Sequence, residues 1–220
     1  MPTVRARPDD LKEACVTEAF AIIAAEGLEK LSLREVARRL GVSHQAPYRH
    51  FPSRDHILAE VVARAFDHFA AYLDGRQRTP DPEQDLGGMG VAYLRYAGEH
   101  PLEYRLMFAT PLPDHTQHPG MMRSARHAFT LLEQGLERMR NALGTASPRD
   151  AITLDALFIW SALHGLAGIQ NGSTIATLAL PRKLLAEAPT HLLTRISHAL
   201  AGGHPGSPSV SPLRHPAGDN

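Results

Sequence analysis

Arginine and amide side chains of the kinds that read DNA gather near the N-terminus of a chain that has no net charge. Five arginines and two carboxylates lie between Arg34 and Asp55, a local charge of +3, whereas 23 basic and 23 acidic residues balance over all 220 residues. Arg49 can form paired hydrogen bonds with guanine, Gln45 can do so with adenine, and the methyl group of Ala46 can contact a thymine methyl. A solvated face of a small helical bundle would carry the same charge. The secondary structure around these residues must therefore decide between a DNA-binding surface and an ordinary solvated face.

Short-range signals place these side chains on two helices joined by a tight turn. Apolar residues recur at helical spacing from Leu33 to Leu40 and stop at Gly41, which tolerates the left-handed conformation that ends a helix. Ser43 is expected to cap a short third helix over residues 45–51 with its hydroxyl. Such a helix-turn-helix leaves one face of the third helix free to enter a major groove.

Longer helices are predicted on both sides of this motif. An apolar stripe over residues 11–23 predicts a first helix that ends at Gly27. A second stripe over residues 57–73 predicts a long helix, with Ser53 as its N-cap. The motif is therefore the middle of a compact helical unit.

These residues resemble the DNA-binding domain of the tetracycline-repressor (TetR) family of bacterial regulators, over roughly residues 9–69. The matching positions are Gly27, Ser32, Ala37, Gly41-Val42-Ser43, Tyr48-Arg49-His50-Phe51, Arg54 and Ile57-Leu58. The chain departs from the family pattern at Gln45 and Pro47, where many members have glycine and a bulky aliphatic residue. Because Pro47 falls in the first turn, where a missing N–H costs little, the departure affects where the third helix starts rather than its role.

The resemblance implies that Tyr48 hydrogen-bonds one phosphate and that Arg54 neutralises another. It also places four side chains against base edges: His44, Gln45, Ala46 and Arg49. The start of the second helix adds Ser32 and Arg34 as phosphate candidates. Together with Ser43 these residues form the expected DNA-binding set, and the expected partner is double-stranded DNA with a palindromic operator.

The rest of the chain also has helical spacing, so we expect an all-α protein. Proline and glycine separate five further predicted helices, at about 83–99, 102–109, 120–143, 149–171 and 181–201. We expect an N-terminal three-helix DNA-binding domain at 9–69 and a helical ligand-binding and dimerisation domain at 83–202. Residues 203–220 are rich in proline and almost free of large apolar residues, which predicts a disordered tail.

The run Trp160-Ser-Ala-Leu-His164-Gly165 resembles the Trp-x-x-x-His-Gly (WHG) signature of one group of TetR C-terminal domains. Trp160 and His164 are four residues apart, which places them on one face of a helix. Three interpretations stay open: the pair lines an effector pocket, belongs to a dimer interface with the last helix, or is plain core. The pocket interpretation adds four residues from neighbouring helices: Tyr104, Met107, Phe108 and His127.

Other functional classes find little support in the sequence. Cys15 is the only cysteine, so neither a disulfide nor a cysteine-based zinc site can form within one chain. His115 and His118 lie in a proline-rich loop in which Asp114 is the only further side chain that could ligate a metal. The sequence also contains no nucleophile elbow, P-loop or dinucleotide fingerprint. We therefore expect no enzyme, no cofactor and no metal site.

The resulting hypothesis is a homodimeric transcriptional regulator, a repressor that a small-molecule effector releases from DNA. The alternative is a constitutive DNA-binding dimer whose C-terminal domain binds no ligand. Residues 1–17 show no secretory-signal pattern. Residues 151–169 are long enough to span a membrane, but Asp155 and His164 inside them favour a buried helix. We expect a cytoplasmic protein without a membrane partner.

Overall fold

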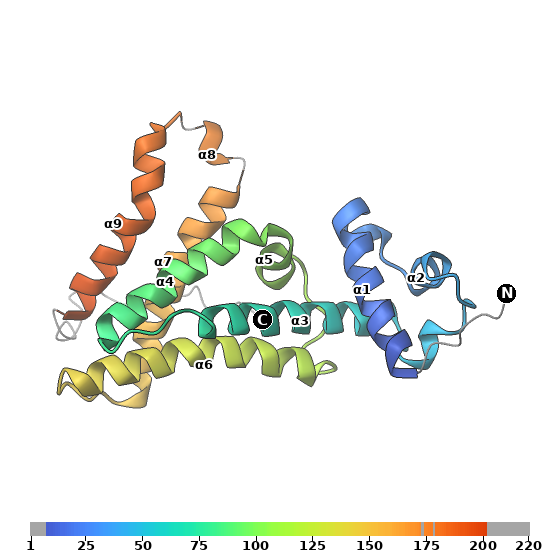
Figure 1. The fold of residues 1–220 in the computed structure, drawn as a ribbon, viewed down its shortest axis with the longest axis horizontal. Helices are drawn as coiled ribbons and strands as arrows, with labels where there is room; N and C mark the ends of the chain where they lie inside the picture. The colour runs from blue at the N-terminus through green and yellow to red at the C-terminus, as the bar shows by residue number, and fades with distance from the viewer. Residues whose placement is uncertain (1–7, 173, 178, 202–220) are drawn as a thin grey trace, which may run out of the picture.

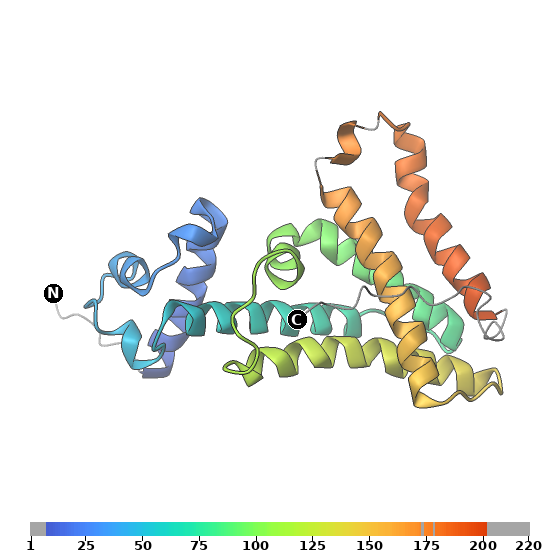
Figure 2. The same ribbon diagram turned by 180° about the vertical axis from the view of Figure 1, so that it is seen from behind.

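The computed structural model describes residues 8–172, 174–177 and 179–201, and every regular element in this part is helical, which confirms the predicted all-α fold. The elements are α1 (Pro8–Glu26), η1 (Leu28–Lys30), α2 (Leu33–Arg39), η2 (Pro47–Arg49), α3 (Arg54–Asp74), α4 (Pro82–Glu99), α5 (Pro101–Phe108), α6 (Pro119–Ala142), α7 (Arg149–Asn171), α8 (Thr174–Thr177) and α9 (Arg182–Ala201). α1 and α2 lie at one end of the molecule, and α3 runs from them into the body formed by the other helices, with α6 alongside it (Figures 1 and 2). The predicted tail at 203–220 lies outside the described residues.

The start and end of α2 follow from local chemistry. Ser32 is the N-cap, and its hydroxyl accepts the backbone N–H of Glu35 at 3.1 Å. Leu33 and Val36 turn inward and are buried. Gly41, just past the helix, has φ +66°, the left-handed conformation predicted for it. The first two parts of the helix-turn-helix therefore form as the sequence suggests.

The third helix is much shorter than the predicted span of 45–51. Residues 44–46 form turns, and only η2 is helical, as one turn of 3-10 helix. Pro47 explains this, because without an N–H it cannot donate to the Ser43 carbonyl and so cannot begin an α-helix there. The Ser43 carbonyl instead accepts the N–H of Ala46 at 2.9 Å. The N-cap of η2 is Ala46, so the predicted capping by the Ser43 hydroxyl is wrong.

The N-cap of α3 also differs in detail from the prediction. Ser53 takes the extended conformation of an N-cap, but its side chain makes no capping hydrogen bond to the helix backbone. Its hydroxyl lies 2.8 Å from Nδ1 of His56. The predicted start of the helix is therefore right, but the Ser53 hydroxyl bonds the His56 imidazole instead of a backbone N–H of the helix.

α3 belongs to both halves of the molecule. Its apolar stripe packs on α1 near its start and on α6, α4 and α5 further along. The domain boundary predicted at residue 69 falls inside this helix, which continues to Asp74. Just beyond, partly buried Arg76 pairs with buried Asp85 of α4 at 2.8 Å and joins the two helices. The predicted DNA-binding domain and the predicted C-terminal domain are thus joined by one continuous helix, α3.

The predicted helices beyond residue 82 are all present, with ends within one residue of expectation. α6, α7 and α9 are held together by Arg140, which is buried. Its guanidinium binds Asp155 of α7 at 2.9 Å and the carbonyl of Leu200 on α9 at 3.0 Å. This side chain closes the far end of the helical body.

α7 buries one face and exposes another. Ile159 and Leu163 are in the core, while Leu154 is 63% exposed and Phe158 48% exposed. The expectation of a buried helix therefore holds for one side only. Within the described residues α7 is the one helix whose length and apolar composition would also suit a membrane span, a test that core helices pass as well.

Candidate DNA-binding surface and central cavity

The segment predicted to contact bases, residues 44–49 and called the base-reading segment below, turns its polar side chains outward because apolar side chains anchor it. Pro47 and Phe51 are buried against the helices behind them. His44, Gln45 and Arg49 are exposed, together with Tyr48 at 48% exposure and the half-buried Ala46. The segment is thus a short ridge of hydrogen-bonding groups on a rigid base.

Ion pairs remove part of the positive charge counted in the sequence. Glu35 accepts from Arg38 Nη2 at 2.6 Å and from Arg39 Nε at 3.0 Å, and these hydrogen bonds lower the pKa of Glu35 to about 2. Arg39 also reaches Glu18 and Glu26 of α1. Arg39 therefore ties α2 to α1, whereas Arg38 pairs within α2. The charge of both arginines is largely balanced by these carboxylates.

The remaining arginines divide into free and engaged side chains. Arg34 and Arg49 are exposed and have no ion-pair partner among the residues that the structure describes. Arg54 instead donates to the carbonyls of Leu28 at 2.8 Å and Leu31 at 3.1 Å. It therefore joins the start of α3 to η1, and its remaining nitrogen, Nη1, lies 3.7 Å from Asp55 Oδ1, so a phosphate would have to share it with that carboxylate.

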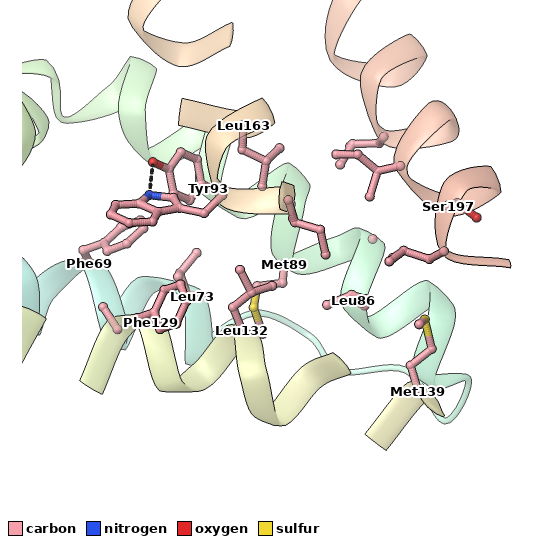
Figure 3. A pocket seen from close by; sticks show the side chains of 18 of the residues that line it. Phe69, Leu73, Leu86, Met89, Tyr93, Phe129, Leu132, Met139, Leu163 and Ser197 are labelled. Carbon is pink, nitrogen blue, oxygen red and sulfur yellow. Dashed lines mark hydrogen bonds between the residues drawn. The ribbon is translucent and has the colours of Figure 1, made fainter. Parts of the chain in front are cut away.

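A central cavity of about 690 Å³ lies among α3, α4, α5, α6, α7 and α9. Aliphatic, sulfur-containing and aromatic side chains form most of its wall (Figure 3). They include Phe69, Leu73, Leu86, Met89, Phe129, Leu132, Met139 and Leu163. The volume and the apolar lining are those of a site for a small organic molecule.

One end of the central cavity is closed by four aromatic residues that bond to one another. The indole N–H of Trp160 donates to the Tyr93 hydroxyl at 3.3 Å (Figure 3). The Tyr93 and Tyr104 hydroxyls lie 3.1 Å apart, and the Tyr104 hydroxyl lies 2.6 Å from Nδ1 of His164. Burial lowers the pKa of His164 and raises those of both tyrosines. A neutral imidazole that accepts the Tyr104 proton satisfies this network.

The opposite end of the central cavity is polar. Glu83 of α4 accepts a hydrogen bond from the Ser197 hydroxyl of α9. Asp81 caps α4 by accepting the N–H groups of Glu83 at 2.9 Å and Gln84 at 3.3 Å. Figure 3 shows Ser197 far from Tyr93 across the apolar wall. The cavity therefore runs from an aromatic end to a mildly acidic one.

Two family models match this chain, and together they span both halves. One, described as "Bacterial regulatory proteins, tetR family", matches residues 16–61. The other, "Tetracyclin repressor-like, C-terminal domain", matches residues 86–193. The chain belongs to the TetR family. The first match covers the helix-turn-helix and the second covers most of the helices around the central cavity, while the WHG subtype stays a prediction.

Individual relatives agree with the TetR assignment. An uncharacterised HTH-type transcriptional regulator of Mycobacterium tuberculosis is 28% identical over 166 residues, 73% of this chain and 70% of the relative. A protein of unknown function from Rhodococcus sp. RHA1 has the same fold, with a TM-score of 0.72 at 21% identity over 90% of this chain and 98% of that one. A transcriptional regulator from Rhodococcus sp. Rha1 superposes with a TM-score of 0.63 at 25% identity, over 88% and 97%. The TetR protein described here is a DNA-binding transcriptional regulator, not an enzyme.

The predicted ligand-binding residues of this TetR chain fall into three positions. Met107, Phe108 and Trp160 lie on the wall of the central cavity. Tyr104 and His164 lie behind that wall, in the hydrogen-bonded network that reaches it through Tyr93. His127 is exposed on α6, so its predicted place in the pocket is wrong. Helical geometry is the reason, because the inward face of α6 is taken by other residues: Ala125, Ala128, Phe129 and Leu132.

The residues that the sequence analysis missed come mainly from α4 and α9. On α4 the wall is formed by Leu86, Met89, Gly90 and Tyr93, whose helical spacing could have revealed a common face. α9 adds its own face because it approaches α4 closely at Gly90, where a Cβ atom would lie 2.5 Å from Leu193 Cδ2. No sequence signal indicates that approach.

Proposed function

We propose that this TetR regulator is a dimeric repressor that a small, largely apolar molecule releases from DNA. The observation that carries the proposal is that α3 reaches both sites. Its Phe69 and Leu73 line the central cavity, and its first residue, Arg54, bonds the carbonyls around η1. A ligand that displaces the cavity end of α3 therefore moves the helix that supports the base-reading segment.

The energy needed for release is small compared with what the central cavity can supply. A tenfold loss of operator affinity requires about 1.4 kcal/mol of differential ligand binding between the DNA-bound and released states. At roughly 25 cal/mol per Å² of apolar surface, about 60 Å² more ligand contact in the released state provides that difference. A cavity of 690 Å³ holds ligands with several times this apolar surface.

The ligand chemistry follows from the two ends of the central cavity. The aromatic end offers ring faces, since the polar groups of Trp160, Tyr93 and His164 already have partners. The other end offers Glu83 and Ser197, which can exchange their mutual hydrogen bond for one to a ligand. A molecule with an apolar body and one hydrogen-bonding end fits this arrangement.

On the DNA side, we propose that the exposed side chains of the base-reading segment meet the major groove. Gln45 is exposed and offers an amide donor and acceptor to adenine, and exposed Arg49 offers guanidinium N–H donors to guanine. His44 and the Ala46 methyl complete the base contacts, and Tyr48 and Arg34 contact phosphates. Ser32 accepts a bond from Glu35 and can still donate its own proton to a phosphate, and Ser43 lies exposed beside the turn.

The dimer is supported by the exposed apolar face of α7. Leu154, Leu157 and Phe158 are exposed along one side of the helix, and Gly165 and Gly168 have open space where a Cβ would lie. On α9, Leu184 is also exposed. A two-fold pairing of these helices would present two base-reading segments to a palindromic operator, and the place of action would be the cytoplasm.

Trp160, the only tryptophan, gives the test a built-in reporter. Candidate effectors that quench its fluorescence should also lower the affinity for DNA from beside the protein's own gene. Ala128→Phe fills the central cavity and should keep DNA binding but lose the response. The matched variant His127→Phe puts the same ring on the outer face of α6 and should respond like wild type.

Two outcomes would overturn parts of the proposal. If no compound that binds beside Trp160 changes the DNA affinity, the constitutive alternative is correct. If Ala128→Phe responds to authentic effectors like wild type, the effector site lies outside the central cavity. If no duplex from the neighbourhood of the gene is bound above non-specific affinity, the assignment of the base-reading segment is wrong.

A further inference from the structure

Two histidines and a glutamate converge away from both the base-reading segment and the central cavity. His68 of α3, His100 between α4 and α5, and Glu103 of α5 each offer one ligand atom, and these atoms lie within 4.8 Å of one another. Glu103 Oε2 lies 2.9 Å from Nδ1 of His68 and 3.5 Å from Nδ1 of His100. We propose that these three residues bind a divalent transition-metal ion of the Zn²⁺ class.

Two of the three ligand-atom separations are close to what a zinc ion requires, and the third, between the two imidazoles, must close from the outer limit of 4.8 Å by side-chain rotation. With metal–ligand bonds of about 2.0–2.2 Å, a tetrahedral ion holds its ligand atoms about 3.3–3.6 Å apart. The His100–Glu103 separation of 3.5 Å already has this value, and the His68–Glu103 pair at 2.9 Å needs to widen by a few tenths of an ångström. Side-chain rotation alone can achieve that, because the two residues are only partly buried.

The backbone and a buried tyrosine hold two of the ligands in place. His100 ends α4 and begins α5: its N–H donates to the Tyr96 carbonyl at 2.8 Å, and its own carbonyl accepts from Tyr104 at 2.9 Å. The hydroxyl of Tyr96, which is fully buried, donates to Glu103 Oε2 at 2.6 Å. Hydrogen bonding of a ligating carboxylate by a second residue is a regular feature of metal sites.

The donor set selects the kind of ion. Two imidazoles and one carboxylate suit Zn²⁺ and its transition-metal neighbours, whereas Mg²⁺ and Ca²⁺ need oxygen ligands throughout. His68 has 46% of its side chain exposed, so an ion can enter from solvent and keep water as a fourth ligand. His68 comes from α3, whereas His100 and Glu103 come from the α4–α5 junction and the first turn of α5, so a bound ion would fasten α3 to that junction.

A simple hydrogen-bonded pair of His68 and Glu103 is the competing interpretation. That pair would leave His100 without a role in the cluster. In the structure the His100 ring meets the His68 ring edge-on, with centroids 4.8 Å apart, and its Nδ1 faces the same carboxylate oxygen. Glu103 Oε2, which already accepts the Tyr96 hydroxyl, faces both imidazole nitrogens, and a cation shared by the three side chains would use all of them.

The test is a Zn²⁺ titration of the full chain against a chromogenic chelator, with thermal unfolding of the same samples. Wild type should bind one equivalent and unfold at a higher temperature with Zn²⁺ than without it, because an ion that binds only the folded state stabilises that state. His68→Gln and His100→Gln should each weaken binding by at least about tenfold and lose the Tm increase. His127→Gln removes an exposed imidazole elsewhere and should behave as wild type.

Substitution of the carboxylate adds a spectroscopic readout. Co²⁺ in place of Zn²⁺ should give the visible absorption of a tetrahedral site in wild type, and Glu103→Gln should abolish it. Zinc affinity unchanged in both histidine variants would overturn the proposal, because surface histidines would then account for the binding. Failure of wild type to bind an equivalent of either ion would overturn it as well.

Discussion

Arg49 and Arg54 carry the same charge close together in the sequence, yet their surroundings assign them different roles. Arg49 stands on the exposed η2 and has no ion-pair partner among the described residues. Arg54 gives two N–H groups to the carbonyls of Leu28 and Leu31. At the scale of the residue, the free donors of a side chain therefore say more about DNA contact than its type does.

Alanine substitutions of the two arginines should have different effects on DNA binding and on stability. Arg49→Ala should cost about 1–3 kcal/mol at the preferred operator and relax the preference at one base pair, with the free energy of unfolding unchanged. Arg54→Ala should weaken binding to every duplex and reduce the salt slope by about one ion. It should also lower the free energy of unfolding by about 1–3 kcal/mol, because two carbonyls lose their donor.

Gel shifts over a salt series and urea unfolding measure both effects. Arg54→Lys is the matched control, since it keeps the charge but cannot reach both carbonyls at once. Equal binding of wild type, Arg49→Ala and Arg54→Ala to every duplex would contradict the assignment.

His164 should make the stability of the C-terminal half depend on pH. Burial lowers its folded-state pKa below the ordinary value of 6.5. A lowered pKa contributes stability that is complete above the unfolded-state value and is lost as the pH falls below it. The free energy of unfolding should therefore fall as the pH drops below about 6.5, and His164→Asn, which keeps an acceptor near Nδ1, should show a smaller fall. The other histidines are common to both proteins, so identical pH slopes would contradict this prediction.

At the scale of the element, the turn between α2 and η2 is decided by two residues with unusual backbones. Gly41 reverses the chain at φ +66°, and Pro47 prevents an α-helix from starting at Ser43. The result is a base-reading segment shorter than an ordinary recognition helix. Its rigidity comes from buried Pro47 and Phe51 rather than from helical hydrogen bonds.

Gly41→Ala should therefore destabilise the protein through backbone strain alone. No atom lies within 4 Å of the position where its Cβ would be, so no clash contributes. The left-handed conformation should cost about 1–2 kcal/mol in the free energy of unfolding, measured by urea titration. Gly88→Ala, at an exposed helical position of α4 with equal space around it, should stabilise by about 0.5–1 kcal/mol. A loss of similar size in both variants would contradict the argument.

At the scale of the whole molecule, α3 and α7 perform complementary tasks. α3 connects the central cavity to the DNA-binding end. α7 faces the cavity with Trp160 and Leu163 on one side and leaves Leu154 and Phe158 exposed on the other. A dimer through the exposed face would place a ligand site directly behind the subunit contact, so that ligand binding and the spacing of the two DNA-binding ends become coupled.

A charge on that face should break the dimer. Phe158→Arg should sediment as a 24.0 kDa monomer at micromolar concentration, whereas wild type should sediment as a dimer. Its operator affinity should fall, because one base-reading segment contacts too few bases. Val91→Arg replaces a comparably exposed apolar residue on α4 and should stay dimeric. A wild type that is monomeric with and without DNA would refute the dimer.

Most elements of this fold could be predicted from the sequence because their signals are local. Helical spacing with its proline and glycine breaks predicted the ends of α4, α5, α6, α7 and α9 to within one residue. Ser32 and Gly41 marked the start and the end of α2. The family resemblance rested on the same short-range features. The third helix is shorter than predicted because Pro47 lacks the N–H that an α-helix starting at Ser43 would need, whereas the prediction placed Pro47 in a first turn that does not need it.

Only the tertiary structure decided which side chains share a site. Helical spacing near His127 does not say which side of α6 meets the core, and the packing of α3, α4 and α7 turned this residue outward. The donors of Arg54 are taken by carbonyls 23 and 26 residues away. His68 and Glu103 meet across 35 residues. Such encounters depend on how helices cross, which follows from the packing of whole faces and leaves no short-range pattern in the sequence.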